Sequence, residues 1–566
     1  MNLNLKKTKQ LISKSLFLIW IFYLAQVNYG CNNEKNLDQK KDVPEDTTPT
    51  QWRVTEIEFV SDKLYSNGFM DIDLDAVFQH PNGTEIKVPA FWNSGKNWMV
   101  RFAPTLPGEW SYRTVCSDTS NTGLHNLTGS ISIAEYTGEL EIYKHGFVKT
   151  TSAQRYFTYA DGTPFFYLGD THWNMPENSI ANFKTIIDKR VEQGFTVIQS
   201  QPIGAGYNLR DGITEGDLFF FSKLDERFKY IADKGFVHAN AQLFFVAELG
   251  PNRAVYTDAY LEKLCRYWVA RYSAFPVMWT TAQECDNDFY RERGDHNYYD
   301  ANTNPWKLVA NYIYKYDPYK HPLTAHMEQT GFSLASQSAF RNLPAHTWFA
   351  PQWPPRKDRQ LDFNIPKDFW NKGQGKPIVN YEGYYDHLWT NEFGARMQGW
   401  TAFLNGMFGH GYGAVDIWLY NSTYDIDNPS VRDGITISVA DKQTKWQESV
   451  EFNSAYQMGY MHEFFKKIDW WNLTPRFDDA SWFENSGSFY SHASIDNEVY
   501  VVYFYNKINK KTGILKNLEN TAYTVQWFNP ISGESGIENT INITDGTYTI
   551  GDKPSIKDWV LLMKKK

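Results

Sequence analysis

"IANFKTIIDKRVEQGFTVIQSQPIG", residues 180–204, joins a helix pattern to a strand pattern across a single glycine. Apolar residues recur at helical spacing at Phe183, Ile187 and Val191. Gly194 follows as a typical helix end, and a β-branched, apolar run comes directly after it. A helix that leads straight into a buried strand is the repeating unit of an alternating α/β fold.

The same plan recurs along the middle of the chain. Two more helix patterns, at 223–235 and 260–273, run into strand patterns at 236–245 and 275–284. Further strand candidates are PFFYLGD (164–170), HPLTAHM (321–327), AHTWFAP (345–351), KPIVNYE (376–382) and GAVDIW (413–418). Together they give the eight strands, with helices between several of them, that a (β/α)8 TIM barrel needs. We therefore predict such a barrel over residues 138–470.

Short alternating strand patterns flank this region on both sides. Between residues 51 and 137 they are separated by turn signals such as HPNGTE and LPGEW, which predicts an N-terminal β-sandwich. Patterns such as NEVYVVYFY and DWVLLMK follow residue 470 and predict a C-terminal β-sandwich over residues 471–566. The fold class expected from the sequence is thus a multidomain chain with a central TIM barrel between two β-sandwiches.

The N-terminal residues have the features of an export signal. Lysines precede the apolar run LFLIWIFYLA (16–25), which is too short to span a bilayer, and Gly30 comes before Cys31. This order is similar to a bacterial lipoprotein signal, in which the cysteine is lipidated. We expect a signal peptide at 1–30, a polar flexible tether at 31–50, and a periplasmic or cell-surface protein held to a membrane through a lipid on Cys31.

Composition narrows the classes of function. The 566 residues are 42% hydrophobic and 17% aromatic, which supports large cores, and the net charge is −9. With no Lys/Arg stripe, this charge argues against nucleic acid as a partner. The four cysteines form neither a CxxC nor a Cys/His pattern, so we expect buried thiols, no metal site and no cofactor. Cys265 and Cys285 could form a disulfide if they were neighbours. The sequence leaves the oligomeric state open.

Two predicted barrel strands end in a glutamate. Glu284 follows strand 4 and Glu382 follows strand 7, and catalytic groups of barrels sit at the carboxyl ends of strands. Glycoside hydrolysis needs two carboxyl groups on opposite sides of the anomeric carbon, and strands 4 and 7 face each other across the barrel mouth. Because barrels with this arrangement are mostly retaining, we expect Glu284 to be the acid/base and Glu382 the nucleophile. For either residue alone, a helix cap or a solvated loop acid is the alternative.

Other polar and aromatic side chains at the predicted strand ends are candidates for sugar binding. They are Asp170, His172, Trp173, Gln201, Gln283, His326, Trp348, Tyr384, His410 and Trp418. Each has a plainer alternative: Asp170 orients His172, the histidines lie in the core, and any one tryptophan fills the core. A metal cluster around His326 has no supporting spacing.

The chain resembles the apiosidase-like glycoside hydrolases. "YFTYADGTPFFYLGDTHWNM" (156–175) is similar to the strand 1 signature of that family, "KPIVNYEGYYD" (376–386) to its strand 7 segment, and "GHGYGAVDIW" (409–418) to its glycine-rich strand 8 segment. "VPAFWNSGKNWMVRFAPTLPGEWSY" resembles the N-terminal domain, known as DUF5060, that accompanies such barrels, and the tail resembles a C-terminal domain labelled collagen-binding. The family's strand 4 acid is typically an aspartate five residues after a tryptophan, whereas Glu284 follows Trp279 here, so apiose specificity is not carried over.

These observations predict an exported glycoside hydrolase. We expect it to cleave glycosidic bonds in plant or algal polysaccharide fragments, with an oligosaccharide or polysaccharide as its ligand. Two alternatives stay open at this point. One is a surface protein that binds polysaccharide without cleaving it, and the other is a polysaccharide lyase with a Tyr or His base.

Overall fold

The computed structural model describes residues 48–173, 175–203, 207–240, 249–250, 252–286, 299–328, 331–332, 335–353, 361–387, 390–419, 445–505 and 509–566. The predicted signal peptide and Cys31 lie outside the described residues, as does the predicted tether up to residue 47. Among the helices that the structure describes, none combines the length and the hydropathy of a membrane span.

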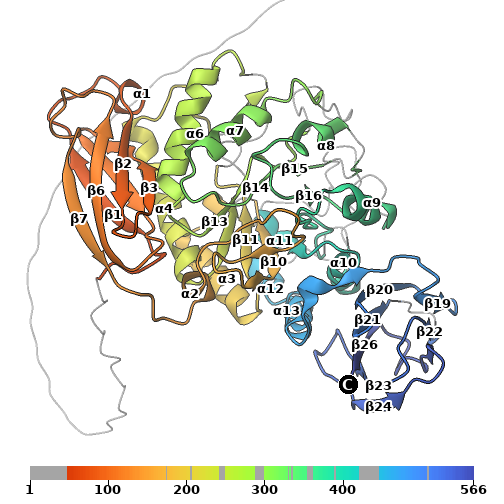
Figure 1. Ribbon diagram of the computed structural model, residues 1–566. Helices are drawn as coiled ribbons and strands as arrows, with labels where there is room; N and C mark the ends of the chain where they lie inside the picture. Colours follow the sequence, from red (N-terminus) through yellow and green to blue (C-terminus); the bar gives the residue numbers. More distant parts are fainter. Residues whose placement is uncertain are drawn as a thin grey trace, which may run out of the picture. The chain divides into compact units, whose positions relative to one another are not determined.

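A six-stranded parallel sheet lies at the centre of the described chain, in the order β14-β13-β12-β11-β10-β17 (Figure 1). Its strands are β10 (Tyr167–His172), β11 (Val197–Ser200), β12 (Val237–Asn240), β13 (Val277–Thr280), β14 (Leu323–Thr324) and β17 (Gly409–Tyr412). All residues of β10 to β13 are buried, as expected for strands covered on both faces. The helices between successive strands are α3 (Ile180–Glu192), α4 (Glu215–Asp233), α6 (Asp258–Tyr272) and α7 (Trp306–Tyr316). The predicted βα alternation is confirmed for this part of the chain.

Shorter pieces continue the parallel arrangement. Strand β15 (His326–Met327) pairs with β16 (Ala350–Pro351), and single parallel bridges join Phe349 to Ile378 and Asn380 to His410. The sheet with these additions is a parallel half-barrel. Around it the chain forms α2 (Glu141–Lys144), β8 (Phe157–Thr158), β9 (Pro164–Phe165), α8 (Ala335–Phe340), α9 (Asn364–Lys372), α10 (Glu392–Leu404), α11 (Val415–Leu419), α12 (Trp446–Ser449) and α13 (Asn453–Phe465).

Two predictions about this region are wrong. The segment 413–418 is not a strand, because the last sheet strand, β17, ends at Tyr412 and helix α11 begins at Val415. Short apolar runs fit either a strand or a buried helix, so the pattern alone does not decide between them. Val191 is 45% exposed although its spacing placed it on the buried face of α3. Each step of four residues rotates the position by about 40°, so two steps from Phe183 turn Val191 toward solvent.

The glycines of β17 explain its place beside β10. A Cβ on Gly411 would lie 2.1 Å from the carbonyl oxygen of Tyr381 and 2.6 Å from Oε1 of Gln199. Only glycine allows the strand to approach these groups so closely. Gln199 fills this space from β11 and donates to Tyr381 O at 2.7 Å.

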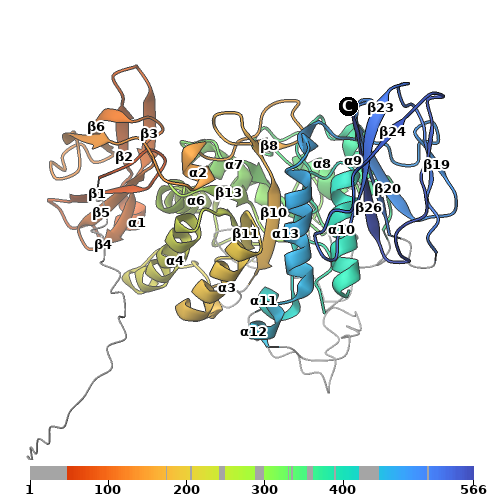
Figure 2. The ribbon, with the colours of Figure 1, turned by 90° about the horizontal axis from the view of Figure 1, so that it is seen from below.

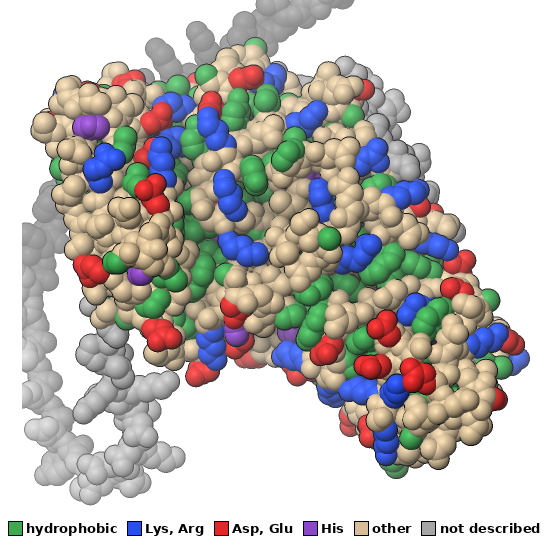
Figure 3. Space-filling view, viewed as in Figure 1, with side chains coloured by type: hydrophobic (Ala, Val, Ile, Leu, Met, Phe, Trp, Pro, Cys, Tyr) green, Lys and Arg blue, Asp and Glu red, His purple; other side chains and the backbone are tan. Residues whose placement is uncertain are grey.

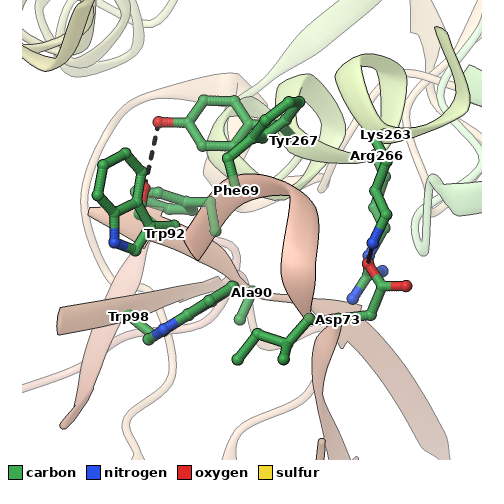
Figure 4. Close-up of a pocket in the computed structure, with 10 residues that line it drawn as sticks. Phe69, Asp73, Ala90, Trp92, Trp98, Lys263, Arg266 and Tyr267 are labelled. Carbon is green, nitrogen blue, oxygen red and sulfur yellow. Dashed lines mark hydrogen bonds and ion pairs between the residues drawn. The ribbon is translucent and has the colours of Figure 1, made fainter. Parts of the chain in front are cut away.

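Two antiparallel sheets precede the parallel sheet. Their orders are β1-β5-β4 and β3-β2-β6-β7. The strands are β1 (Thr55–Val60), β2 (Leu74–Gln79), β3 (Glu85–Pro89), β4 (Phe91–Ser94), β5 (Asn97–Phe102), β6 (Gly108–Cys116) and β7 (Thr128–Ile133), with α1 (Gly68–Asp71) between β1 and β2. Figure 4 shows how α6 meets this part: Tyr267 donates to Trp92 O at 3.3 Å, and Lys263 and Arg266 both lie against Asp73.

The C-terminal part is also antiparallel. A six-stranded sheet has the order β18-β20-β21-β26-β23-β24, and a three-stranded sheet has the order β19-β22-β25. The strands are β18 (Thr474–Pro475), β19 (Phe483–Asn485), β20 (Tyr490–Ile495), β21 (Val499–Phe504), β22 (Gly513–Leu515), β23 (Ala522–Phe528), β24 (Asn539–Asn542), β25 (Tyr548–Thr549) and β26 (Trp559–Lys565). Helix α10 packs against β20 and β21 and beside α13 (Figure 2). A separate apolar core contains residues from both sheets.

The surface and the thiols agree with the composition. On the face seen in Figure 3, Lys and Arg side chains are scattered singly across the middle, and many of the Asp and Glu side chains lie along the lower edges. Cys116, Cys265 and Cys285 are free and buried, which confirms the expectation of buried thiols for these three. Burial raises the pKa of the Cys265 and Cys285 thiols, so both are neutral at physiological pH.

Candidate active site

Glu284 and Glu382 lie on either side of one imidazole, that of His326. The backbone N–H of Glu284 donates to Nδ1 of His326 at 3.3 Å, and Nε2 of His326 lies 3.5 Å from Oε2 of Glu382. All three residues are buried. Because Nδ1 accepts a hydrogen bond, the neutral ring carries its proton on Nε2, which faces Glu382. The two acids chosen from the sequence are therefore brought to the same place.

Parallel strand pairing explains this meeting. Strand β13 leads to Glu284, and the next strand along the sheet continues into β15, which begins at His326. The N–H of Cys285 donates to His326 O at 2.9 Å, which ties the turn after β13 to the start of β15. Glu284 itself has φ +45°, in the left-handed region. Gln352, which follows β16, places its Nε2 3.4 Å from Oε1 of Glu284.

Donor groups converge on the carboxylate of Glu382. The hydroxyl of Tyr385 donates to Oε1 of Glu382, and Nε1 of Trp173 donates to that hydroxyl at 2.9 Å. Nε1 of Trp173 is also 3.5 Å from Oε1 of Glu382, and its ring stacks on His326 with 6.0 Å between centroids. Donors on Oε1 stabilise the ionised form of a carboxylate, and the Trp173–Tyr385 chain polarises the bond further.

Asp170 and His172 form a buried cluster with Arg190 of α3. Oδ2 of Asp170 accepts from Nε of Arg190 at 2.7 Å and lies 2.6 Å from Nε2 of His172. Burial opposes ionisation of Asp170, but Arg190 and His172 outweigh it and hold the pKa of this carboxyl below its usual value. The cluster joins α3 to the carboxyl end of β10, one residue before Trp173. Asp170 thus orients His172, which was its plainer interpretation.

Gln201 and Gln283 come after strands β11 and β13, whereas His410 lies inside β17, opposite Leu168 of β10. Nε2 of Gln201 donates to Ile203 O at 3.0 Å, and Nδ1 of His410 lies 3.3 Å from the Asn380 amide. Burial lowers the pKa of His410 to about 3, so this ring is neutral at physiological pH. Gln283 is half-buried beside Glu284.

Tyr384 and Trp418 are two further candidates for sugar binding from the sequence. The N–H of Tyr384 donates to Oε1 of Gln398 at 2.7 Å. This bond connects the residue two positions after Glu382 to helix α10. The side chain of Trp418 lies outside the described residues.

Trp348 lies elsewhere. Its ring is fully buried and packs against Phe157 of β8 and Tyr167, the first residue of β10. Tyr167 begins β10, whereas Asp170, His172 and Trp173 mark its carboxyl end. Phe157 lies in the separate β8–β9 pair, and a third ring neighbour is Tyr381, the residue before Glu382. Trp348 therefore fills the core, and its predicted role in sugar stacking does not fit this position.

Two residues of the site were missed by the sequence argument. Tyr385 contacts Glu382 directly, and Arg190 holds Asp170, whereas Gln352, which contacts Glu284, follows a predicted strand end. Tyr385 had a signal, because it lies three residues after Glu382 in the strand 7 segment. Arg190 had none, because a basic residue in the last turn of a helix is ordinarily solvated. Among the described residues, no group of three or more His, Cys, Asp or Glu side chains is arranged to hold a metal ion.

Comparisons with known proteins place the chain in a family. A family model described as "Apiosidase-like, catalytic domain" matches residues 151–472, more than half of the chain, and a domain of unknown function, DUF5060, matches residues 48–117. No curated protein matches the chain.

Solved structures share the fold at low sequence identity. A candidate glycoside hydrolase from Bacteroides vulgatus ATCC 8482 aligns with a TM-score of 0.64 at 17% identity, covering 92% of this chain and 100% of that one. A glycoside hydrolase family 5 structure from the same organism aligns with a TM-score of 0.59 at 18% identity, covering 75% of this chain and 94% of that one. The chain belongs to the apiosidase-like family, and this membership, with a fold shared with glycoside hydrolases, supports a glycoside hydrolase at a general level.

Proposed function

We propose that the chain is a retaining glycoside hydrolase in which Glu382 is the nucleophile and Glu284 the general acid/base. The observation that carries the proposal is the position of both acids around His326, at the carboxyl ends of the parallel strands. The proposed substrates are fragments of plant or algal polysaccharides. No cofactor takes part in the reaction.

The residues have complementary roles in this reaction. The Glu382 carboxylate, held by Tyr385 and His326, attacks the anomeric carbon while Glu284 gives its proton to the leaving oxygen. The products of this step are a glycosyl ester on Glu382 and a free alcohol. Glu284, now a carboxylate, takes a proton from water, which attacks the ester and returns Glu382.

We also propose that the half-barrel closes into a complete (β/α)8 barrel between two β-sandwiches. Residues 378–380 would be the seventh strand, since parallel bridges join them to the segment before β16 on one side and to β17 on the other. Closure would bring Glu382 across the barrel mouth from Glu284, as two-carboxylate chemistry requires.

Export and lipid anchoring are part of the proposal. The lysine-rich start, the short apolar run and Cys31 support a lipoprotein on a membrane facing the periplasm or the cell surface. Labelling of the expressed protein with a fatty-acid analogue tests this. The wild-type chain is expected to incorporate label and Cys31→Ala to incorporate none, and label on the variant would contradict the assignment.

Product chromatography on a polysaccharide panel tests the catalytic assignment. Glu382→Gln and Glu284→Gln are each expected to lower turnover at least about 100-fold, the usual contribution of a positioned acid or base. On an aryl glycoside whose leaving group needs no proton, Glu284→Gln should still form the glycosyl-enzyme, and azide should restore its turnover. Glu484→Gln, an exposed position on β19, is the matched control.

Several outcomes would refute the assignment. Near wild-type turnover by either active-site variant excludes that residue. Unsaturated products that absorb in the ultraviolet would indicate a lyase, and glycan binding by calorimetry without any product would indicate a binding protein. An inverted anomeric product, seen by NMR, would refute the nucleophile role of Glu382.

A further inference from the structure

A cavity lies beside the turn that carries Glu284. It has a volume of about 430 Å³, within the range of small-ligand sites, and it lies at the amino-terminal turn of α7. The residues that follow β12 in the chain and those that follow β13 both contribute to its lining. In a βα arrangement these segments belong to the carboxyl-end face of the sheet, which is the face that presents Glu284.

Two residues of the cavity lining donate hydrogen bonds to the residues directly after Glu284. Nδ2 of Asn304 donates to Cys285 O at 3.0 Å, and the N–H of Tyr299 donates to Asp286 O at 2.9 Å. Asn304 is buried, so its amide fixes the distance between the cavity and the acid turn. The cavity is thus on the side of Glu284, the residue proposed to protonate the leaving oxygen.

The lining combines apolar surface with several polar groups and carries positive charge. It includes the amides of Asn302 and Asn311 and the ring of Tyr299, groups that suit hydroxyl-rich ligands. Arg253 and Lys307 are its two cations, and none of the described residues that line it is acidic.

The two cations differ in their partners. The guanidinium of Arg253 pairs with Asp258, whereas Nζ of Lys307 donates to the backbone carbonyl of Ala301 at 3.2 Å and forms no ion pair with any described residue. The nearby Asp300 carboxylate accepts from the N–H of Asn302 at 2.8 Å. Lys307 is therefore the charge in the cavity that is available to an anionic group.

We propose that this cavity is a subsite for the leaving-group portion of a saccharide that carries an anionic substituent, either a carboxylate or a sulfate. The inference rests on the proposed function, because it takes the Glu284 side as the leaving-group side. Lys307 binds the anion, Asn302 and Asn311 bind hydroxyl groups, and Tyr299 offers a ring to the sugar face. The site would select acidic polysaccharides over neutral ones of the same linkage.

Calorimetry on the full chain tests the subsite. The probes are a galacturonic acid tetrasaccharide, a sulfated galactose tetrasaccharide and a neutral galactose tetrasaccharide, which separate the carboxylate, the sulfate and the sugar itself. Lys307→Met is expected to weaken binding of at least one anionic probe about tenfold, the effect of one charge-assisted hydrogen bond, and to leave the neutral probe unchanged. Lys315→Met removes the same charge from the same helix outside the cavity and should change nothing.

A second variant makes the test independent of Lys307. Asn311→Asp adds a carboxylate at an exposed position of the lining and should weaken the same anionic probe by a similar factor. Equal binding of all probes, or unchanged binding by both variants, would overturn the proposal. If the wild-type chain cleaves none of the panel but both variants lose anion binding, the subsite is supported and the hydrolase is refuted. Failure of the subsite and failure of the proposed function are therefore distinguishable.

Discussion

Asp558→Asn is expected to lower the free energy of opening between α10 and the C-terminal sheet by about 3 kcal/mol. Asp558 accepts two hydrogen bonds from Arg396 of α10, from Nε and Nη2, each at 2.8 Å. The two side chains are only 3% and 1% exposed. The hydroxyl of Tyr503 on β21 donates to the same carboxylate at 2.9 Å. The substitution keeps the shape of the side chain but removes its charge.

The magnitude follows from what remains after the change. Loss of one partner from a buried ion pair costs about 3–5 kcal/mol, since the other charge stays buried without compensation. Glu392 limits the loss, because its Oε1 lies 3.3 Å from Nη1 of Arg396 and its side chain is 40% exposed. The asparagine also keeps one oxygen acceptor. Both features place the expected cost at the lower end of the range.

Hydrogen exchange measures this cost locally. Peptides from β26 should exchange faster in Asp558→Asn, by a factor that corresponds to about 3 kcal/mol of opening free energy. Arg396→Met combined with Asp558→Leu removes both charges and should recover most of the loss. Glu519→Gln, which breaks the exposed pair with Lys565, should cost under about 1 kcal/mol. A cost below about 1 kcal/mol for Asp558→Asn would refute the reasoning.

Two further predictions concern the site and the pH dependence of stability. Tyr385→Phe removes a donor to Glu382 and should lower kcat/KM about 10- to 100-fold in steady-state assays, and an unchanged value would show that the bond plays no part in turnover. Burial and Arg476 lower the pKa of His492 to about 3, so only the unfolded chain binds this proton as pH falls from about 6.5. Stability is therefore lost below that pH, and His492→Phe should remove about 1.4 kcal/mol per pH unit of the slope in denaturation at pH 6 and pH 5; an unaltered slope would contradict this.

Periodicity predicted the parallel part of the fold well. The helices α3, α4 and α6 are long enough to show a helical period, and each ends close to the strand that follows it. The later strands are harder, because β14, β15 and β16 have two residues each and so carry no period of their own. Strand β17 was placed too late in the chain because its glycines, which it needs for close approach, are weak strand formers.

The candidate site likewise contains residues that have a local signal in the sequence and residues that have none. Strand ends predicted Glu284, Glu382 and His326, because the position of a polar residue after an apolar run is a local signal. Tyr385 and Arg190 act through contacts made by tertiary packing. Nothing in the helix pattern of α3 indicates that Arg190 is buried, since its burial depends on the charge of Asp170.

The backbone at Glu284 is the strongest sign that this turn is built for the side chain it carries. A φ of +45° is unfavourable for a residue other than glycine, asparagine or aspartate, at a cost of about 1 kcal/mol or more. Two hydrogen bonds to His326, from the N–H groups of Glu284 and Cys285, hold the turn in this conformation. A glycine would relieve the strain and remove the carboxyl group. The same turn fixes the carboxyl group near Gln352. The carbonyl groups of Cys285 and Asp286 accept hydrogen bonds from Asn304 and Tyr299 of the cavity lining, so this strained turn is tied to both sites.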